Sequence, residues 1–221
     1  MADSILIIGE SGKGKSRALI NMDETSSYLI NVANKPLPFP GAKKKFSKDK
    51  KNMEHIMDPV VIRDRIGQIS SNPKASHIKV IIVDDVQYIM ANEFVEKAMI
   101  KGYEKFTIMA KHIYDLISPQ FLASLRDDLT VVFLSHSEDT GEKVKFKTIG
   151  KMLDEKITVE GLFTVVLSAE VKVENGKNKY FFLTQTDGRN TCKSPEGMFE
   201  SMEIPNDLSY VITKMKEYYE S

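Results

Sequence analysis

The chain has one cysteine, no net charge and no long apolar run, and each of these features excludes a class of protein. Among its 221 residues Cys192 is the only thiol, which excludes an intramolecular disulfide and a four-cysteine zinc site and fits a reducing compartment. The 31 Lys and Arg residues balance 31 Asp and Glu residues, which argues against a wholly basic nucleic-acid binder. No segment reaches the roughly 20 apolar residues of a membrane helix, and the N-terminus lacks the basic region of a signal peptide. We therefore expect a cytoplasmic protein with no membrane partner.

Short apolar runs alternate with helical patterns as far as residue 135, which indicates a parallel sheet covered by helices on both faces. The segments with strand character are residues 4–8, 27–33, 80–83, 129–134, 164–173 and 179–184. The segments with helical periodicity are residues 14–22, 59–71, 93–101, 103–116 and 208–219. The stretches 34–51 and 137–147 are polar or rich in proline and are expected to be loops.

A hairpin is predicted near the C-terminus, because Asn175-Gly176 is a strong turn signal between two segments with strand character. The chain is therefore expected to have an α/β fold with a mainly parallel sheet flanked by helices and an antiparallel hairpin added near the C-terminus. Its length suits a single domain, with a core in residues 1–170 and the hairpin and last helix in residues 171–221.

The strongest motif is the segment GESGKGKS, residues 9–16, which fits the pattern G-x-x-x-x-G-K-[ST] without departure. Glycines let successive backbone amides converge on phosphate oxygens, and a following helix N-terminus adds partial positive charge. A chance match in a glycine turn is the alternative, and the predicted strand before the motif and helix after it argue against that alternative. We assign nucleotide binding to the motif and the next residue, namely Gly9, Glu10, Ser11, Gly12, Lys13, Gly14, Lys15, Ser16 and Arg17.

This motif predicts ATP and Mg²⁺ as the ligands, with Lys15 against the β- and γ-phosphates and the Ser16 hydroxyl on the metal. A second acidic motif, Asp84-Asp85, ends the predicted strand 80–83, which we expect to lie beside the first strand. Asp84 would then hold the Mg²⁺, and Asp85 could orient or deprotonate the attacking water. A solvated strand end or a helix N-cap is the alternative for both carboxylates.

His136 follows the next predicted strand, at a position expected to face the γ-phosphate. It could donate a hydrogen bond there and sense the γ-phosphate, or it could be an ordinary surface histidine. The other histidines show no ligand spacing, so no metal other than Mg²⁺ is expected.

Lysines cluster in two further places. The run from Lys43 to Lys51 is a solvated loop or a contact to nucleic acid, in which Lys43, Lys44 and Lys45 would bind phosphates and Phe46 would stack on a base. Lys147 and Lys151 are candidates for reaching the γ-phosphate of a neighbouring subunit, or are simply solvated.

Several segments together resemble bacteriophage AAA-family ATP-binding proteins, which are RecA-like P-loop ATPases; these segments are GESGKGKS, NVANKPLPFPGAKKKF, VIIVDDVQYIMANEF, LRDDLTVVFLSHSED, KTIGKMLDEKIT and KSPEGMFE. The resemblance covers nearly the whole chain. It implies an ATPase of phage DNA recombination, annealing or replication that binds single-stranded DNA, forms a homo-oligomer, meets phage replication or recombination proteins and works in the host cytoplasm.

Two departures from RecA-type recombinases leave the hydrolysis mechanism open. Those proteins place a catalytic glutamate just after the second strand, whereas residues 31–34 here are NVAN, and they often place glutamine where this chain has Ser135-His136. Either Asp85 takes over the role of the glutamate or hydrolysis is slow. The alternatives to a DNA-dependent ATPase are a non-catalytic nucleotide switch or scaffold and a small-molecule P-loop kinase; the scattered arginines argue against the kinase.

Overall fold

The continuous apolar runs form the buried centre of one mixed sheet. A computed structural model describes residues 2–149 and 157–220 of the chain. The strands are, in chain order, β1 (Asp3–Gly9), β2 (Ser27–Asn31), β3 (Met53–Glu54), β4 (Val80–Asp84), β5 (Thr130–Asp139), β6 (Val144–Phe146), β7 (Val165–Glu174), β8 (Lys177–Leu183) and β9 (Glu203–Pro205). The helices are η1 (Ser16–Asn21), α1 (Ala42–Lys45), α2 (Pro59–Ser71), η2 (Pro73–Ala75), α3 (Gln87–Glu96), α4 (Glu104–Ile117), α5 (Pro119–Ala123), η3 (Val159–Leu162) and α7 (Leu208–Glu220), where η marks a 3₁₀ helix.

The strand order across the sheet is β3-β2-β4-β5-β1-β7-β8-β9, with β6 paired to β5 outside this path. Along this order, β3, β2, β4, β5, β1 and β7 pair with their neighbours in parallel. Strand β8 pairs antiparallel with both β7 and β9. The predicted α/β class, mostly parallel with antiparallel strands near the C-terminus, is confirmed. The expectation that the acidic strand lies beside the first strand is wrong, because β5 lies between β4 and β1.

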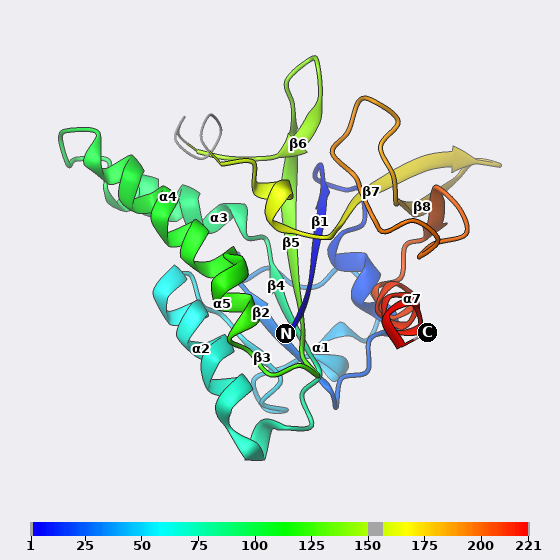
Figure 1. The fold of residues 1–221 in the computed structure, drawn as a ribbon, viewed down its shortest axis with the longest axis horizontal. Helices are drawn as coiled ribbons and strands as arrows, with labels where there is room; N and C mark the ends of the chain where they lie inside the picture. The colour runs from blue at the N-terminus through cyan, green and yellow to red at the C-terminus, as the bar shows by residue number, and fades with distance from the viewer. Residues whose placement is uncertain (1, 150–156, 221) are drawn as a thin grey trace.

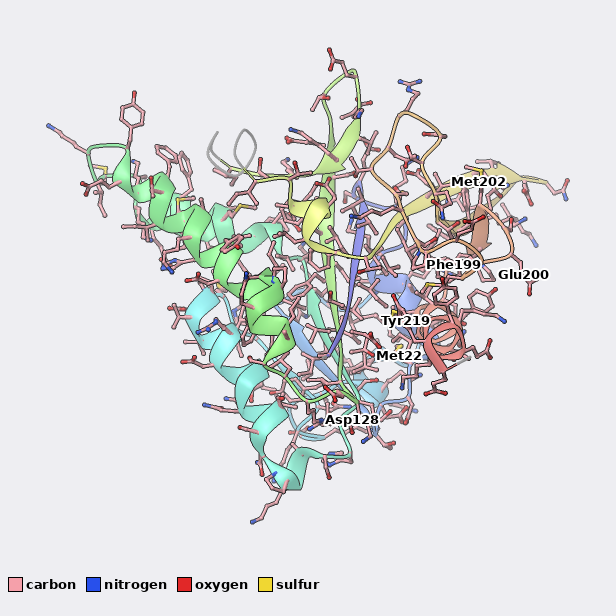
Figure 2. The ribbon with its side chains drawn as sticks, in the orientation of Figure 1. Met22, Asp128, Phe199, Glu200, Met202 and Tyr219 are labelled. Atoms are coloured by element: carbon pink, nitrogen blue, oxygen red, sulfur yellow. The ribbon has the colours of Figure 1, made fainter. Side chains whose placement is uncertain are left out.

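Each central strand contributes side chains to two separate cores, which is why its sequence is apolar throughout. In β1, Leu6 and Ile8 belong to the core under α2 and α4, whereas Ile5 and Ile7 belong to the core under η1 and α7. Figure 1 shows α2, α4 and α5 on one side of the sheet and α7 on the other. Figure 2 shows Met22 beside α7, and Met22 packs in the same core as Ile5 and Ile7.

Several elements lie where the sequence predicted them. Helix α2 has the predicted bounds, and its Asp58 N-cap accepts hydrogen bonds from the amides of Val60 and Val61 at 2.8 and 3.2 Å. Helices α4 and α7 differ from prediction by one residue at each end or less. The predicted hairpin is formed by β7 and β8 around Asn175-Gly176, both of which have positive φ as the two-residue turn requires.

Several predicted elements differ from the structure, and the loop expected over 34–51 contains the short helix α1. The helix expected over 14–22 is a 3₁₀ helix of six residues, and after it the side chain of Asp23 accepts from the amide of Thr25 in a turn before β2. The helix expected over 93–101 starts earlier, at Gln87, and ends earlier, at Glu96. Part of the loop expected over 137–147 is an antiparallel pair of β5 and β6, with Gly141 in the turn at a φ of 84°.

Among the described residues, no helix has both the length and the apolar character needed to cross a bilayer.

Candidate nucleotide site

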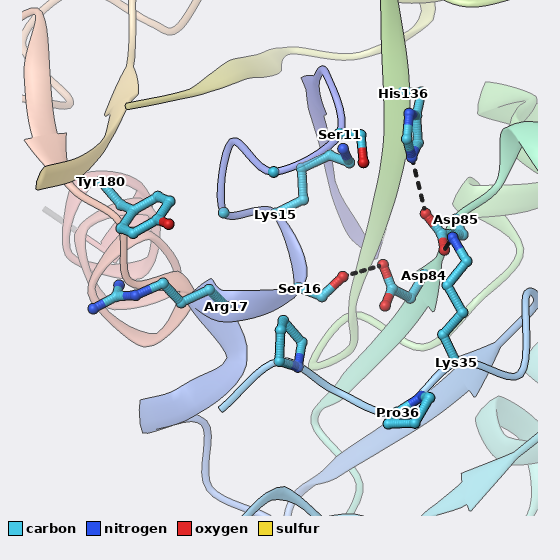
Figure 3. Close-up of a pocket in the computed structure, with 13 residues that line it drawn as sticks. Ser11, Lys15, Ser16, Arg17, Lys35, Pro36, Asp84, Asp85, His136 and Tyr180 are labelled. Atoms are coloured by element: carbon cyan, nitrogen blue, oxygen red, sulfur yellow. Dashed lines mark hydrogen bonds and ion pairs between the residues drawn. The ribbon is translucent and has the colours of Figure 1, made fainter. Parts of the chain in front are cut away.

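The phosphate loop meets the ends of β4 and β5 at one edge of the sheet, and a cavity of about 340 Å³ opens between them (Figure 3). Parallel strands bring their carboxyl ends to the same edge, so segments far apart in the chain converge there. The cavity is lined by Ser11, Gly12, Gly14, Lys15, Ser16, Arg17, Lys35, Pro36, Pro38, Asp84, Asp85, His136 and Tyr180. Ser11, Gly12, Gly14, Lys15 and Ser16 of the phosphate loop thus line one cavity with Asp84, Asp85 and His136, although Ser11 and His136 are 125 positions apart, whereas Gly9, Glu10 and Lys13 do not line it.

The loop conformation depends on its glycines. Gly12 and Gly14 have φ values of 83° and 94°, which other residues adopt only with strain. A Cβ atom added to Gly14 would lie 2.7 Å from Cδ1 of Tyr180, so this position has no room for a side chain. Because the helix after the loop is short and of the 3₁₀ type, the aligned helix dipole is smaller than predicted, and the anion-binding groups are the loop amides and Lys15.

The Lys15 side chain folds back over its own loop. Its Nζ donates hydrogen bonds to the carbonyl oxygens of Gly9 and Glu10 at 2.7 and 2.9 Å, and only 6% of the residue is exposed. Burial lowers the pKa of Lys15 to about 8, although the charges of Asp85 and Asp84 oppose this shift. A phosphate oxygen would replace neutral carbonyls as the partner of a desolvated ammonium, which is a stronger, charge-assisted hydrogen bond.

Ser16 and Asp84 form the pair that fits a magnesium ion. The Ser16 hydroxyl donates to Oδ1 of Asp84 at 3.0 Å, and Asp84 is 4% exposed. Burial and the charge of Asp85 raise the pKa of Asp84 to about 7, so a cation there would stabilise the ionised form. Within residues 2–149 and 157–220 no three His, Cys, Asp or Glu side chains cluster as metal ligands, so phosphate and water oxygens would complete the shell that Mg²⁺ requires.

Asp85 is held by three side chains and has a φ of 67°, which is uncommon for a residue other than glycine. Its carboxylate accepts from Lys35 at 2.9 Å and from Gln87 at 3.4 Å, and His136 Nε2 lies 3.5 Å away. Burial raises the pKa of Asp85, but the hydrogen bonds from His136, Lys35 and Gln87 and the charge of Lys35 outweigh it, and the net pKa is well below the usual range. In this arrangement Asp85 is a weak base and serves as an anchor for its neighbours.

His136 lines the cavity from within β5, which continues to Asp139 and does not end before His136 as predicted, and its side chain points toward Asp85 (Figure 3). The Gln87 side chain bridges the two, since its Oε1 accepts from the His136 amide at 3.0 Å and its Nε2 donates to Asp85. The His136 ring also meets the Tyr88 ring edge-on, with centroids 6.0 Å apart. These contacts hold the imidazole at the cavity wall.

The remaining phosphate-loop residues differ in their contacts. Lys13 points away from the cavity, and its Nζ donates to Glu170 on β7 at 2.9 Å. Arg17 lies 4.9 Å from the centre of the Tyr180 ring and donates to Oδ1 of Asn206 at 3.3 Å. Arg17 and Tyr180 therefore form one wall of the cavity, at the end away from Asp85 (Figure 3).

The predicted DNA contacts divide into exposed and inward-facing side chains. Lys43 and Lys44 on α1 are exposed. Lys45 turns inward, and its Nζ donates to the carbonyl of Ile20 at 2.7 Å. Phe46 is 1% exposed and packs in the core under η1 and α7, so the expectation that its ring stacks on a base is wrong for this conformation.

Of the two lysines proposed to act on a neighbouring subunit, the structure describes Lys147, which does not line the cavity. Lys147 is exposed, and its amide donates to the carbonyl of His136 at 3.0 Å, so it follows β6 close to the site. Lys151 lies outside the described residues.

The cavity residues that local sequence patterns do not predict come from the segment after β2 and from β8. Lys35, Pro36 and Pro38 enter the cavity from the segment after β2, and Tyr180 enters from β8. The signal for Lys35 was available, because it is the first charged residue after a predicted strand whose end should share the edge of Asp84. No local pattern singles out Tyr180, which faces the phosphate loop only because β8 pairs with β7.

No protein-family model matches the chain, and no curated protein does so either. Among solved structures the chain is similar to the KaiC-like protein PH0186 of the hyperthermophilic archaeon Pyrococcus horikoshii OT3. The TM-score is 0.49 at 13% sequence identity, over 82% of this chain and 77% of that chain.

Proposed function

We propose that this chain binds ATP with Mg²⁺ at the phosphate loop and hydrolyses it slowly to ADP and phosphate. The observation that carries the proposal is the convergence of Lys15, Ser16 and Asp84 in one cavity, with the Ser16 hydroxyl 3.0 Å from the Asp84 carboxylate. These are the cation, hydroxyl and carboxylate that phosphate–Mg²⁺ binding needs in a P-loop site.

The residues of the site also indicate how hydrolysis would proceed. A bound Mg²⁺ would neutralise charge on the β- and γ-phosphates, and Ser16 and Asp84 are the side chains that would hold it. In hydrolysis a water oxygen bonds to the γ-phosphorus, the bond to the β–γ bridging oxygen breaks, and one proton leaves to solvent. Since the transition state is loose, positioning matters more than a strong base, and Asp85 with His136 supports the orientation of the water.

The direct test is a titration of the wild-type chain with a fluorescent ATP analogue, with and without Mg²⁺, alongside phosphate release. We expect saturable, Mg²⁺-dependent binding and a slow release of phosphate. Asp84→Asn should reduce the Mg²⁺ dependence by about ten-fold, the size of one charge-assisted contact. Absence of binding under both conditions would refute the proposal, and binding without any phosphate release, even with single-stranded DNA, would leave the nucleotide-switch alternative in its place.

Single-stranded DNA binding is a second proposal, in line with the resemblance to phage recombination and annealing ATPases. It is supported by the exposed Lys43 and Lys44 on α1, which adjoins the proline-rich segment that enters the nucleotide cavity. Each lysine that contacts a phosphate releases a counterion, so the two together should contribute about −1.4 to the slope of log affinity against log salt.

Replacing Lys43 and Lys44 by alanine should therefore reduce the magnitude of this slope by about 1.4, measured by fluorescence anisotropy with a labelled oligonucleotide. The matched control replaces Lys74 and Lys101, which are equally exposed and lie elsewhere on the surface. An unchanged slope in the first variant, or an equal fall in the control, would exclude α1 as the contact.

The proposal extends to a homo-oligomer in which Lys147 reaches a neighbouring nucleotide, and to phage replication or recombination proteins as partners. Light scattering with an ATP analogue and DNA tests the assembly, and a monomer under all conditions would contradict it.

A further inference from the structure

The backbone of Lys35 is fixed at the edge of the nucleotide cavity by a buried asparagine. Asn31, at the end of β2 and 5% exposed, donates from Nδ2 to the Lys35 carbonyl at 2.7 Å and accepts from the Lys35 amide at 3.3 Å. Pro36 and Pro38 follow and restrict the φ angles of the segment. The Lys35 side chain therefore extends from a backbone segment that the Asn31 hydrogen bonds and the following prolines restrain.

The Lys35 side chain reaches across the cavity to the acidic strand end (Figure 3). Its Nζ is 2.9 Å from Oδ2 of Asp85 and 4.4 Å from the centre of the Tyr88 ring. The side chain is 52% exposed and lines the cavity, so it is accessible to a ligand while Asp85 holds its ammonium. Burial lowers the pKa of Lys35, but the hydrogen bond and charge of Asp85 outweigh it and raise the net pKa, so the side chain is a cation at neutral pH.

Lys35 and Lys15 flank the proposed metal site from two sides. Lys35, Lys15 and Asp84 all line the same cavity of about 340 Å³, so the two ammonium groups and the carboxylate share one small space. Lys15 already accounts for one cation on the phosphates. The second cation, Lys35, directly follows residues 31–34, the region in which RecA-type recombinases are expected to carry a catalytic glutamate. The charge of Lys35 is therefore opposite to that of the glutamate which the resemblance implies.

We propose that Lys35 is the γ-phosphate-binding cation of this site and that it makes the site prefer a nucleoside triphosphate over a diphosphate. On this proposal, which rests on the proposed nucleotide binding, the ammonium exchanges Asp85 for a γ-phosphate oxygen. A diphosphate offers no such oxygen, so with ADP the Lys35–Asp85 ion pair stays closed. The positive group that senses the γ-phosphate is then supplied within the same subunit, and a Lys147 from a neighbouring subunit would add a further cation.

The test compares the affinity for a non-hydrolysable ATP analogue with that for ADP, both with Mg²⁺, by calorimetry. The wild-type chain should bind the analogue more tightly than ADP. Lys35→Met should reduce this ratio of affinities by about ten-fold, the size of one lost charge-assisted hydrogen bond, with the ADP affinity changed by less than about two-fold. Lys35→Arg should keep most of the ratio, because the cation remains.

Two outcomes separate this inference from the function on which it rests. If the wild-type chain binds neither nucleotide, the proposed function fails and the inference with it. If the wild-type chain binds both but Lys35→Met leaves the ratio unchanged, only the role of Lys35 is refuted, and the same holds if the wild-type ratio is one. Lys74→Met, an exposed lysine outside the cavity, is the matched control and should leave both affinities as they are.

Discussion

Replacing Lys15 by alanine should reduce ATP hydrolysis by about 100-fold or more and weaken binding of the triphosphate. The expected size follows from the loss of a preorganised charge at the phosphates in a partly dehydrated site, where one such donor contributes about 10²–10³ in rate. Lys15 is 6% exposed, and among the residues that the structure describes its ammonium donates to the carbonyls of Gly9 and Glu10 and to no carboxylate. The measurement is phosphate release at saturating ATP, with affinity from the fluorescent analogue.

The matched control for this variant is Lys79→Ala. Lys79 precedes β4 and pairs with Asp128, at the end of the strand opposite to Asp84. The Lys79→Ala variant removes a lysine that lies outside the cavity. The rate of ATP hydrolysis and the affinity for the ATP analogue should therefore stay within about two-fold, as for surface substitutions generally. If Lys15→Ala hydrolyses ATP as fast as Lys79→Ala does, the phosphate loop is not the site of the reaction.

Replacing Phe46 by alanine should lower the free energy of unfolding by about 3–5 kcal/mol, the usual cost of deleting a buried phenylalanine side chain. Phe46 is 1% exposed and belongs to the core that also contains Leu19 and Phe39, beneath the segment that follows the phosphate loop. Urea denaturation measures the change. Phe94→Ala is the control, because Phe94 is 39% exposed and should lose less than about 1 kcal/mol.

A second variant separates this packing role from the predicted contact with a base. Phe46→Leu keeps most of the buried volume and removes the aromatic ring. We expect the affinity for single-stranded DNA to stay unchanged in this variant, since a buried ring cannot stack on a base. A loss of DNA affinity with unchanged stability would instead show that Phe46 leaves the core when DNA binds.

Much of the fold follows from local patterns that the sequence carries in full. The runs at β1, β4 and β5 are apolar on both faces, which identifies central parallel strands without any knowledge of their neighbours. Helix α2 carries its start signals within three residues, Asp58 and Pro59, and these are visible in the sequence. The phosphate loop is equally local, because eight consecutive residues supply the glycines, the lysine and the serine.

The errors arose where a distant segment decides the outcome. Phe46 follows three lysines, so the local sequence suggests a solvated loop, but α1 docks on the core and the ring goes inside. The predicted place of the acidic strand β4 beside β1 was also wrong. Continuous apolar runs identify central strands but do not specify which of them pair.

A phosphate loop on a parallel sheet can be predicted from the amino-acid sequence, since spacing, glycines and apolar runs are short-range properties. The surroundings of that loop depend on how distant segments pack together. Asp85 is paired with Lys35, 50 positions earlier in the chain, because β2 and β4 are neighbours and their ends share one edge of the sheet. Tyr180 reaches the loop for the same kind of reason, through the pairing of β7 with β8. The charge and shape of the site thus depend on contacts between strand ends, which spacing along the chain does not encode.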